Sequence, residues 1–113
     1  MMTFKELDET VSVAPQIQPD DIAAIIAAGF KSIICNRPDD EEDDQPSYAL
    51  IEAAARKAGV PICNIPVVSG RITRQNVVDM KAALEDMPKP VFAYCRSGAR
   101  CTNLYAMVED LDD

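Results

Sequence analysis

One short segment of the chain combines residue types and spacing suited to nucleophilic chemistry: Cys95-Arg96-Ser97-Gly98-Ala99-Arg100. It lies between an apolar run and a helical pattern, so its backbone N–H groups are expected to converge at a helix N-terminus. Gly98 permits a backbone conformation that side chains resist, and Arg100 offers a planar fork of donors to an anion. These features favour Cys95 as a thiolate, which is the nucleophilic form of cysteine.

The rest of the composition restricts how that cysteine can be activated. Histidine is absent, and none of the four cysteines stands in a Cys-x-x-Cys pair. We therefore predict no zinc site, no metal or organic cofactor, and no Cys-His pair. The thiolate of Cys95 must instead be stabilised by arginine and by backbone dipoles.

Strands and helices alternate along the 113 residues. We predict an N-terminal hairpin formed by residues 4–7 and 11–14. Three further strands are predicted over residues 31–36, 60–65 and 91–94, and four helices over residues 22–28, 46–58, 73–87 and 98–111. Thr73 is a candidate helix N-cap. The pattern indicates one α/β domain over residues 1–113: three layers, with a mostly parallel sheet of four to five strands and helices on both faces.

In such sheets, ligands bind beyond the carboxyl ends of the strands. Three segments are expected there, residues 37–45, 66–72 and 95–100, and the first of them is strongly acidic. The net charge of −8 disfavours nucleic-acid and anionic membrane partners. No apolar run is long enough to span a bilayer, and the N-terminus lacks a signal-peptide pattern. We therefore expect a cytoplasmic protein.

The Cys95–Arg100 segment resembles the anion-binding loop of protein tyrosine phosphatases and rhodaneses. Three segments in order are similar to the phosphatase-like domain of beta-lactamase-hydrolase-like proteins, the DUF442 family: Ile34-Cys35-Asn36-Arg37-Pro38-Asp39, Ile65-Pro66-Val67 and Tyr94-Cys95-Arg96-Ser97-Gly98. The resemblance implies a tyrosine-phosphatase-like α/β fold. Some relatives are fused to a persulfide dioxygenase and act as sulfurtransferases, whereas others are described as phosphatases.

Two departures from the phosphatase pattern bear on the reaction. Four residues separate Cys95 from Arg100, as in rhodaneses, whereas phosphatases have five. The stretch 66–73, where such phosphatases carry an acidic residue, contains no carboxylate. Loss of general acid catalysis costs roughly 10²–10⁴ in rate. Asp39 or Asp40 of the acidic segment are candidate replacement acids.

These departures favour sulfur transfer as the leading function. Cys95 would take sulfane sulfur from thiosulfate or a low-molecular-weight persulfide and pass it to a thiol acceptor, with Arg100 stabilising the charged states. The alternative is a tyrosine- or dual-specificity-like phosphatase that forms a Cys95 phosphocysteine. A third possibility is a non-catalytic anion-binding or docking module that partners a persulfide dioxygenase.

Other residues are secondary candidates. Arg96, Ser97, Gly98 and Ala99 would form the anion-binding loop with Cys95. Arg71 and Arg74 are candidates for binding a small anionic substrate, although solvated arginines at a helix start are equally consistent with the sequence. Cys101 either packs inside the last helix or resolves an oxidised Cys95 as a disulfide.

Overall fold

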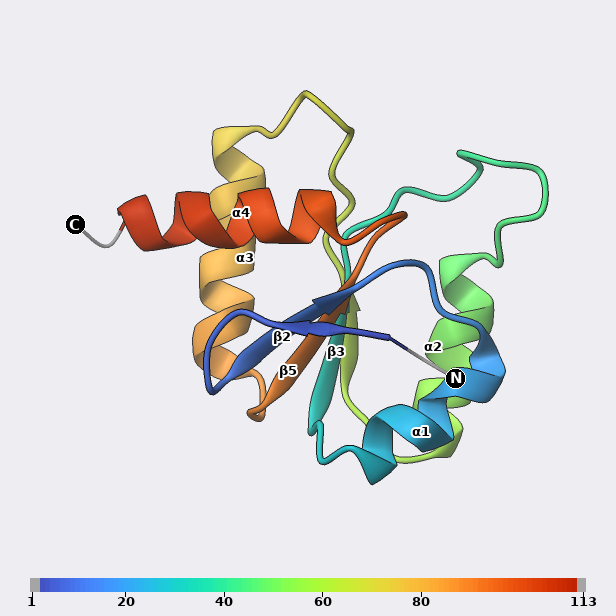
Figure 1. Cartoon of the computed structure of the whole chain (residues 1–113). Coiled ribbons are helices and arrows are strands. Elements are labelled where there is room, and N and C mark those ends of the chain that lie inside the picture. The colour runs from blue at the N-terminus through green and yellow to red at the C-terminus, as the bar shows by residue number, and fades with distance from the viewer. Residues whose placement is uncertain (1–2, 112–113) are drawn as a thin grey trace.

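The structure, a computed structural model, describes residues 3–111 and shows a five-stranded sheet between two layers of helices (Figure 1). The strand order is β1-β2-β5-β3-β4, with β1 antiparallel to β2 and every other neighbouring pair parallel. The strands are β1 (Lys5–Glu6), β2 (Val11–Ala14), β3 (Ser32–Cys35), β4 (Ile62–Asn64) and β5 (Val91–Tyr94). The predicted mostly parallel α/β sheet is confirmed.

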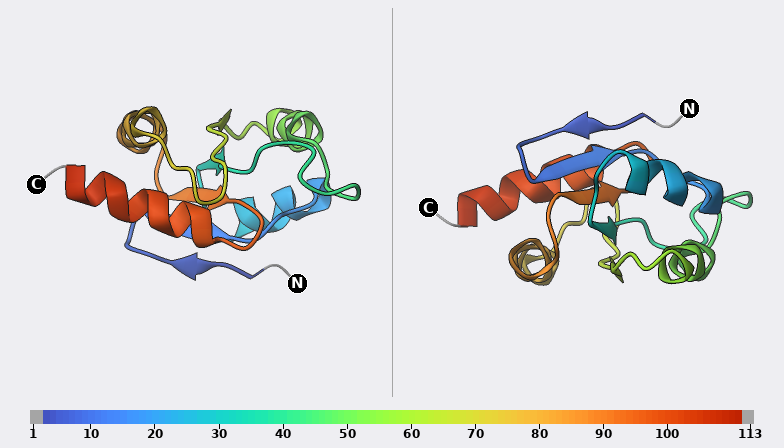
Figure 2. Two further views of the ribbon diagram at one scale, coloured as in Figure 1. Left: turned by 90° about the horizontal axis from the view of Figure 1, so that it is seen from above. Right: turned by 90° about the horizontal axis from the view of Figure 1, so that it is seen from below.

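The helices pack in two pairs on opposite faces of this sheet. They are α1 (Ile22–Ala27), which follows the short 3-10 helix η1 (Pro19–Asp21), then α2 (Tyr48–Lys57), α3 (Arg74–Asp86) and α4 (Ala99–Leu111). One core cluster joins α3 and α4 to one face of the sheet, and a second joins α1 and α2 to the other. Figure 2 shows the same separation from above and below.

The alternation of side chains along β5 accounts for these two clusters. Val91 and Ala93 pack in the α3–α4 cluster, whereas Phe92 and Tyr94 pack in the α1–α2 cluster. All four are buried, which is typical of a central parallel strand covered on both faces. The strand that leads into Cys95 is therefore held firmly from both sides.

The helix starts follow ordinary capping chemistry. The hydroxyl of Thr73 accepts a hydrogen bond from the N–H of Asn76 at 3.0 Å, so Thr73 is the N-cap of α3, as predicted. Ser47 caps α2 in the same way, by accepting from the N–H of Leu50. Within residues 3–111, no helix combines the length and apolarity needed to cross a membrane.

Candidate active site

The loop that carries the candidate nucleophile, residues 95–100 and here called the Cys95 loop, leaves β5 and turns directly into α4. β5 lies between β2 and β3, so the loop emerges at the centre of the sheet's carboxyl edge. The N–H of Cys95 donates to the carbonyl of Ala14 at 3.2 Å, and Arg96 O accepts from the N–H of Gln16 at 3.2 Å. Gly98 has φ +93°, which glycine alone adopts without strain.

The sulfur of Cys95 is the point on which the Cys95 loop converges. The N–H of Gly98 donates to Sγ at 3.1 Å. A hydrogen bond from the thiol of Cys101, together with the N–H groups of Cys101, Gly98 and Arg100, lowers the pKa of Cys95 to about 5, although burial opposes the shift. Cys95 is therefore a thiolate at neutral pH, and anion binding by its loop stays a prediction.

Cys101 acts in this arrangement as a donor. The residue is fully buried, and the neighbouring Cys95 sulfur together with burial raises the pKa of Cys101 well above its ordinary value. Cys101 thus stays protonated, and its S–H donates a hydrogen bond to the Cys95 thiolate. Neither cysteine forms a disulfide, and the resolving role of Cys101 stays a prediction.

Alkylation of Cys95 as a function of pH measures this stabilisation. Because only the thiolate reacts, the rate should rise through pH 5 and be constant at neutral pH, whereas a free cysteine titrates near ~8.5. Cys101→Ala removes the thiol donor and should move the midpoint upward. Cys101→Ser keeps a donor and should preserve the low midpoint.

Site-resolved mass spectrometry after iodoacetamide treatment gives the rate at Cys95 alone. Cys63→Ala is the matched control, because Cys63 lies on β4 and its sulfur contacts Met87 Sδ at 3.6 Å rather than the Cys95 loop. A wild-type midpoint at or above ~8.5 would contradict the proposed thiolate.

Arg100 is the last residue of the Cys95 loop, and its buried guanidinium has hydrogen-bond partners at only some of its donors. Nη1 and Nη2 donate to the two carboxylate oxygens of Glu41, both at 2.7 Å. Nη1 also donates to the carbonyl of Val67, which follows β4, at 2.9 Å. Within residues 3–111, no acceptor is bonded to Nε of Arg100, so its Nε–Nη2 edge remains available to an anion.

The acidic loop, residues 37–45, therefore contributes Glu41 to the site. The Arg100 hydrogen bonds, with help from Arg37, lower the pKa of Glu41 to about 2. Glu42 bonds Arg96 Nε at 2.9 Å. The sequence analysis missed Glu41 and Glu42, because nothing in a run of six acidic residues indicates which of them pair with the arginines of the site.

The two candidate acids lie elsewhere in the acidic loop. Asp39 accepts a hydrogen bond from the N–H of Tyr48, the first residue of α2, at 2.8 Å, so its carboxylate stabilises the N-terminus of that helix. Asp40 is exposed, with φ +63°. Neither lines the cavity beside the Cys95 loop, and their proposed role as acids stays a prediction.

A polar cavity of about 660 Å³ opens next to the Cys95 loop. Its lining residues come from three loops and are Glu41, Glu42, Ser69, Arg96, Ser97, Ala99 and Arg100. Cys95 has no exposed surface and is not among them. The cavity is lined by the neighbours of Cys95 within the loop, Arg96 and Ser97, and by Arg100.

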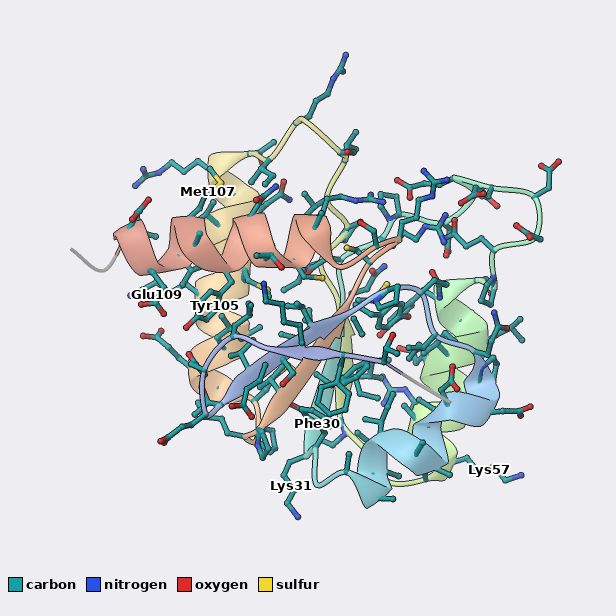
Figure 3. All side chains as sticks on the ribbon, viewed as in Figure 1. Phe30, Lys31, Lys57, Tyr105, Met107 and Glu109 are labelled. Atoms are coloured by element: carbon teal, nitrogen blue, oxygen red, sulfur yellow. The ribbon has the colours of Figure 1, made fainter. Side chains whose placement is uncertain are left out.

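The remaining two arginines of the sequence analysis lie away from this cavity. Arg74 lines a separate groove with Met107 and Asp110, between α3 and α4. Figure 3 shows Met107 on the side of α4 that faces away from Tyr105. Arg71 is exposed in the loop before α3. The substrate-binding role given to both stays a prediction. Among residues 3–111, no group of three metal-ligating side chains converges.

The fold and the loop together define a class: an α/β domain with a buried cysteine thiolate in a strand-loop-helix anion nest. The family described as the phosphatase-like domain of beta-lactamase hydrolase-like protein matches residues 3–111. The chain belongs to this family, as the resemblance in its sequence indicated.

Full-length relatives are much longer than this chain. Beta-lactamase hydrolase-like proteins of Agrobacterium fabrum and Xylella fastidiosa are 37% and 32% identical over 111 residues. In each case the match covers 98% of this chain and 26% of the relative. The chain thus spans about a quarter of the length of the curated relatives it matches.

Solved structures agree on the fold. A Neisseria meningitidis protein described as a candidate phosphatase has a TM-score of 0.83 and 38% identity, over 89% of this chain and 72% of its own. The catalytic core of the Saccharomyces cerevisiae phosphatase Siw14 has a TM-score of 0.72 over 96% of this chain and 65% of its own. At 14% identity the yeast enzyme supports the fold alone.

Proposed function

We propose that the chain is a cysteine-dependent phosphatase in which Cys95 is the nucleophile. The observation that carries this proposal is the Cys95 sulfur, held as a thiolate by the donors of its own loop. Membership of a phosphatase-like family and the tyrosine-phosphatase-like fold support it. They favour the phosphatase alternative over the sulfur transfer that the loop spacing and the missing acid suggested.

The reaction follows from the groups around the sulfur. The thiolate attacks phosphorus, the bond from phosphorus to the ester oxygen breaks, and the leaving group departs with the electron pair. The loop N–H groups and the free edge of Arg100 bind the phosphoryl oxygens, whose charge they stabilise in the transition state. Water then attacks the phosphocysteine, releasing phosphate and regenerating the thiolate.

Among the residues that the structure describes, the site has no evident acid to protonate the leaving group. Glu41 is the carboxylate closest to Arg100, yet with a pKa of about 2 it is ionised and has no proton to donate. We therefore expect the hydrolysis rate to fall steeply as the leaving group becomes more basic. A series of substituted phenyl phosphates measures this dependence, and a rate independent of leaving-group pKa would indicate an acid that the proposal lacks.

Sulfur transfer remains a second candidate because of the four-residue spacing between Cys95 and Arg100 and the missing acid. Sulfite leaves thiosulfate when Cys95 attacks its sulfane sulfur, and the Cys95 thiolate leaves when a thiol acceptor takes that sulfur. Neither leaving group needs a proton, so the missing acid matters less for sulfur transfer than for ester hydrolysis. Assays of aryl phosphate hydrolysis and thiosulfate:cyanide transfer on one preparation separate the two. Phosphatase activity without sulfur transfer supports the proposal. Sulfur transfer without phosphatase activity would make sulfur transfer the leading function.

A docking module is the proposal that remains if both assays give no activity. In that case the anion site would serve recognition, for example of a persulfide dioxygenase. Binding of inorganic phosphate without turnover would then be the expected result, and Cys95→Ser would leave that binding nearly intact.

A further inference from the structure

Arg37 is a buried charge that the proposed reaction does not use directly. It follows β3, and only 3% of its surface is exposed. A buried charge is costly unless it is fully paired. Its Nε donates to Glu41 at 2.9 Å, its Nη1 to Gln16 at 3.0 Å and its Nη2 to Glu42 at 2.8 Å. Arg37 therefore ties the acidic loop to the chain that follows β2.

Both carboxylates that Arg37 holds also bind an arginine of the Cys95 loop. Glu41 takes two hydrogen bonds from Arg100 at 2.7 Å. Glu42 accepts from Arg96 Nε at 2.9 Å. The result is a chain of alternating charges that runs from the interior beside β3 to the rim of the cavity.

These ion pairs determine which edge of the Arg100 guanidinium is free to bind a substrate. Glu41 occupies the Nη1–Nη2 end, and the carbonyl of Val67 takes a further bond from Nη1. The Nε–Nη2 edge, left without an acceptor among residues 3–111, has the parallel donors that bind two oxygens of an oxyanion. Arg37 Nε donates to Oε1 of Glu41, the same oxygen that accepts from Arg100 Nη2, so Arg37 adds a third hydrogen bond that holds this carboxylate in place.

On the basis of the proposed function, we infer that Arg37 is a positioning residue for the oxyanion site. Through Glu41 it fixes the edge that Arg100 presents to the substrate, and through Glu42 it holds Arg96 at the cavity rim. The Glu41 link should dominate, since Arg96 and Glu42 are exposed and exposed ion pairs contribute little.

The test uses inorganic phosphate as the probe, through its protection of Cys95 against alkylation. Arg37→Gln should weaken phosphate binding by about 10- to 100-fold, the range typical of losing a residue that orients a ligand-binding group. The alkylation midpoint of Cys95 should stay near pH 5, because it is set by the Cys95 loop and by Cys101. Glu41→Gln should weaken phosphate binding similarly.

A double-mutant cycle checks that Arg37 acts through Glu41. The double variant should be no weaker in phosphate binding than the worse single variant, whereas additive losses would contradict the inference. Arg56→Gln is the matched control, because Arg56 is exposed and pairs with Glu52 at 3.2 Å on α2. Its phosphate affinity should stay within about twofold of wild type.

Three further outcomes are decisive. Phosphate affinity within about twofold of wild type in Arg37→Gln would overturn the inference. So would simultaneous loss of thermal stability and of the low Cys95 midpoint, since that indicates general structural support. If Arg37→Gln does not fold, Arg37→Lys keeps the charge but cannot reach all three partners; it should still weaken phosphate binding, and wild-type affinity would overturn the inference.

This assay does not depend on turnover, so it separates the inference from the proposed function. Loss of phosphate binding in Arg37→Gln, in a protein that hydrolyses no phosphate ester, would support the positioning role and contradict the phosphatase. Normal phosphate binding in an active phosphatase would do the reverse.

Discussion

Cys95→Ser should lower aryl phosphate hydrolysis by at least about a thousandfold, the scale of loss seen when an enzyme's nucleophile is removed. The donors around Cys95 stabilise a thiolate with a pKa of about 5. A serine hydroxyl titrates far above that range, and the chain contains no histidine to act as its base. The measurement is kcat/KM for a phenyl phosphate with a good leaving group.

Cys63→Ser provides the control for this variant. It makes the same atomic change in a free thiol on β4, whose sulfur contacts Met87 rather than the Cys95 loop. Its hydrolysis rate should match wild type, and circular dichroism should show that both variants are folded. Substantial activity remaining in Cys95→Ser would place the nucleophile elsewhere and remove the basis of the proposed mechanism.

Arg100→Lys should lower kcat/KM by about 10²–10³, the cost of losing a donor to the transition-state oxyanion. Lysine keeps the positive charge beside Glu41 but lacks the planar edge that binds two oxygens at once. The loss should appear in phosphate affinity as well, because the same edge binds the product. The low alkylation midpoint of Cys95 should persist, since backbone N–H groups and Cys101 set it.

Arg56→Lys is the corresponding control on α2, where the arginine is exposed and pairs with Glu52. It should leave kcat/KM unchanged within about twofold. Wild-type phosphate affinity and kcat/KM in Arg100→Lys would mean that charge alone is required. In that case the free Nε–Nη2 edge of Arg100 would have no role in binding the oxyanion.

Much of the fold could be predicted from local sequence. The apolar run before Cys95, the cap at Thr73 and the glycine at position 98 each depend on a few neighbouring residues. Convergence of the N–H groups on Cys95 follows from a strand that turns at once into a helix. The match of residues 3–111 to the phosphatase-like family agrees with the resemblance of three short segments.

The partners of Arg100 could not be predicted in this way. Glu41 lies 59 positions away along the chain. It also accepts from Arg37, whose Nη1 in turn donates to Gln16 after β2. The loop spacing and the missing acid favoured sulfur transfer, whereas the family favours the phosphatase. Local sequence indicates the length of the loop but not the distant side chains, such as Glu41, that complete the site.

The most direct test of the central claim is to trap the covalent intermediate. The protein should be mixed with an aryl phosphate, quenched in acid within the first turnover and digested for mass spectrometry. We predict one phosphoryl group on the peptide that contains Cys95, and none in Cys95→Ser. An unmodified Cys95 peptide during active turnover, or a phosphoryl group on another residue, would contradict the account.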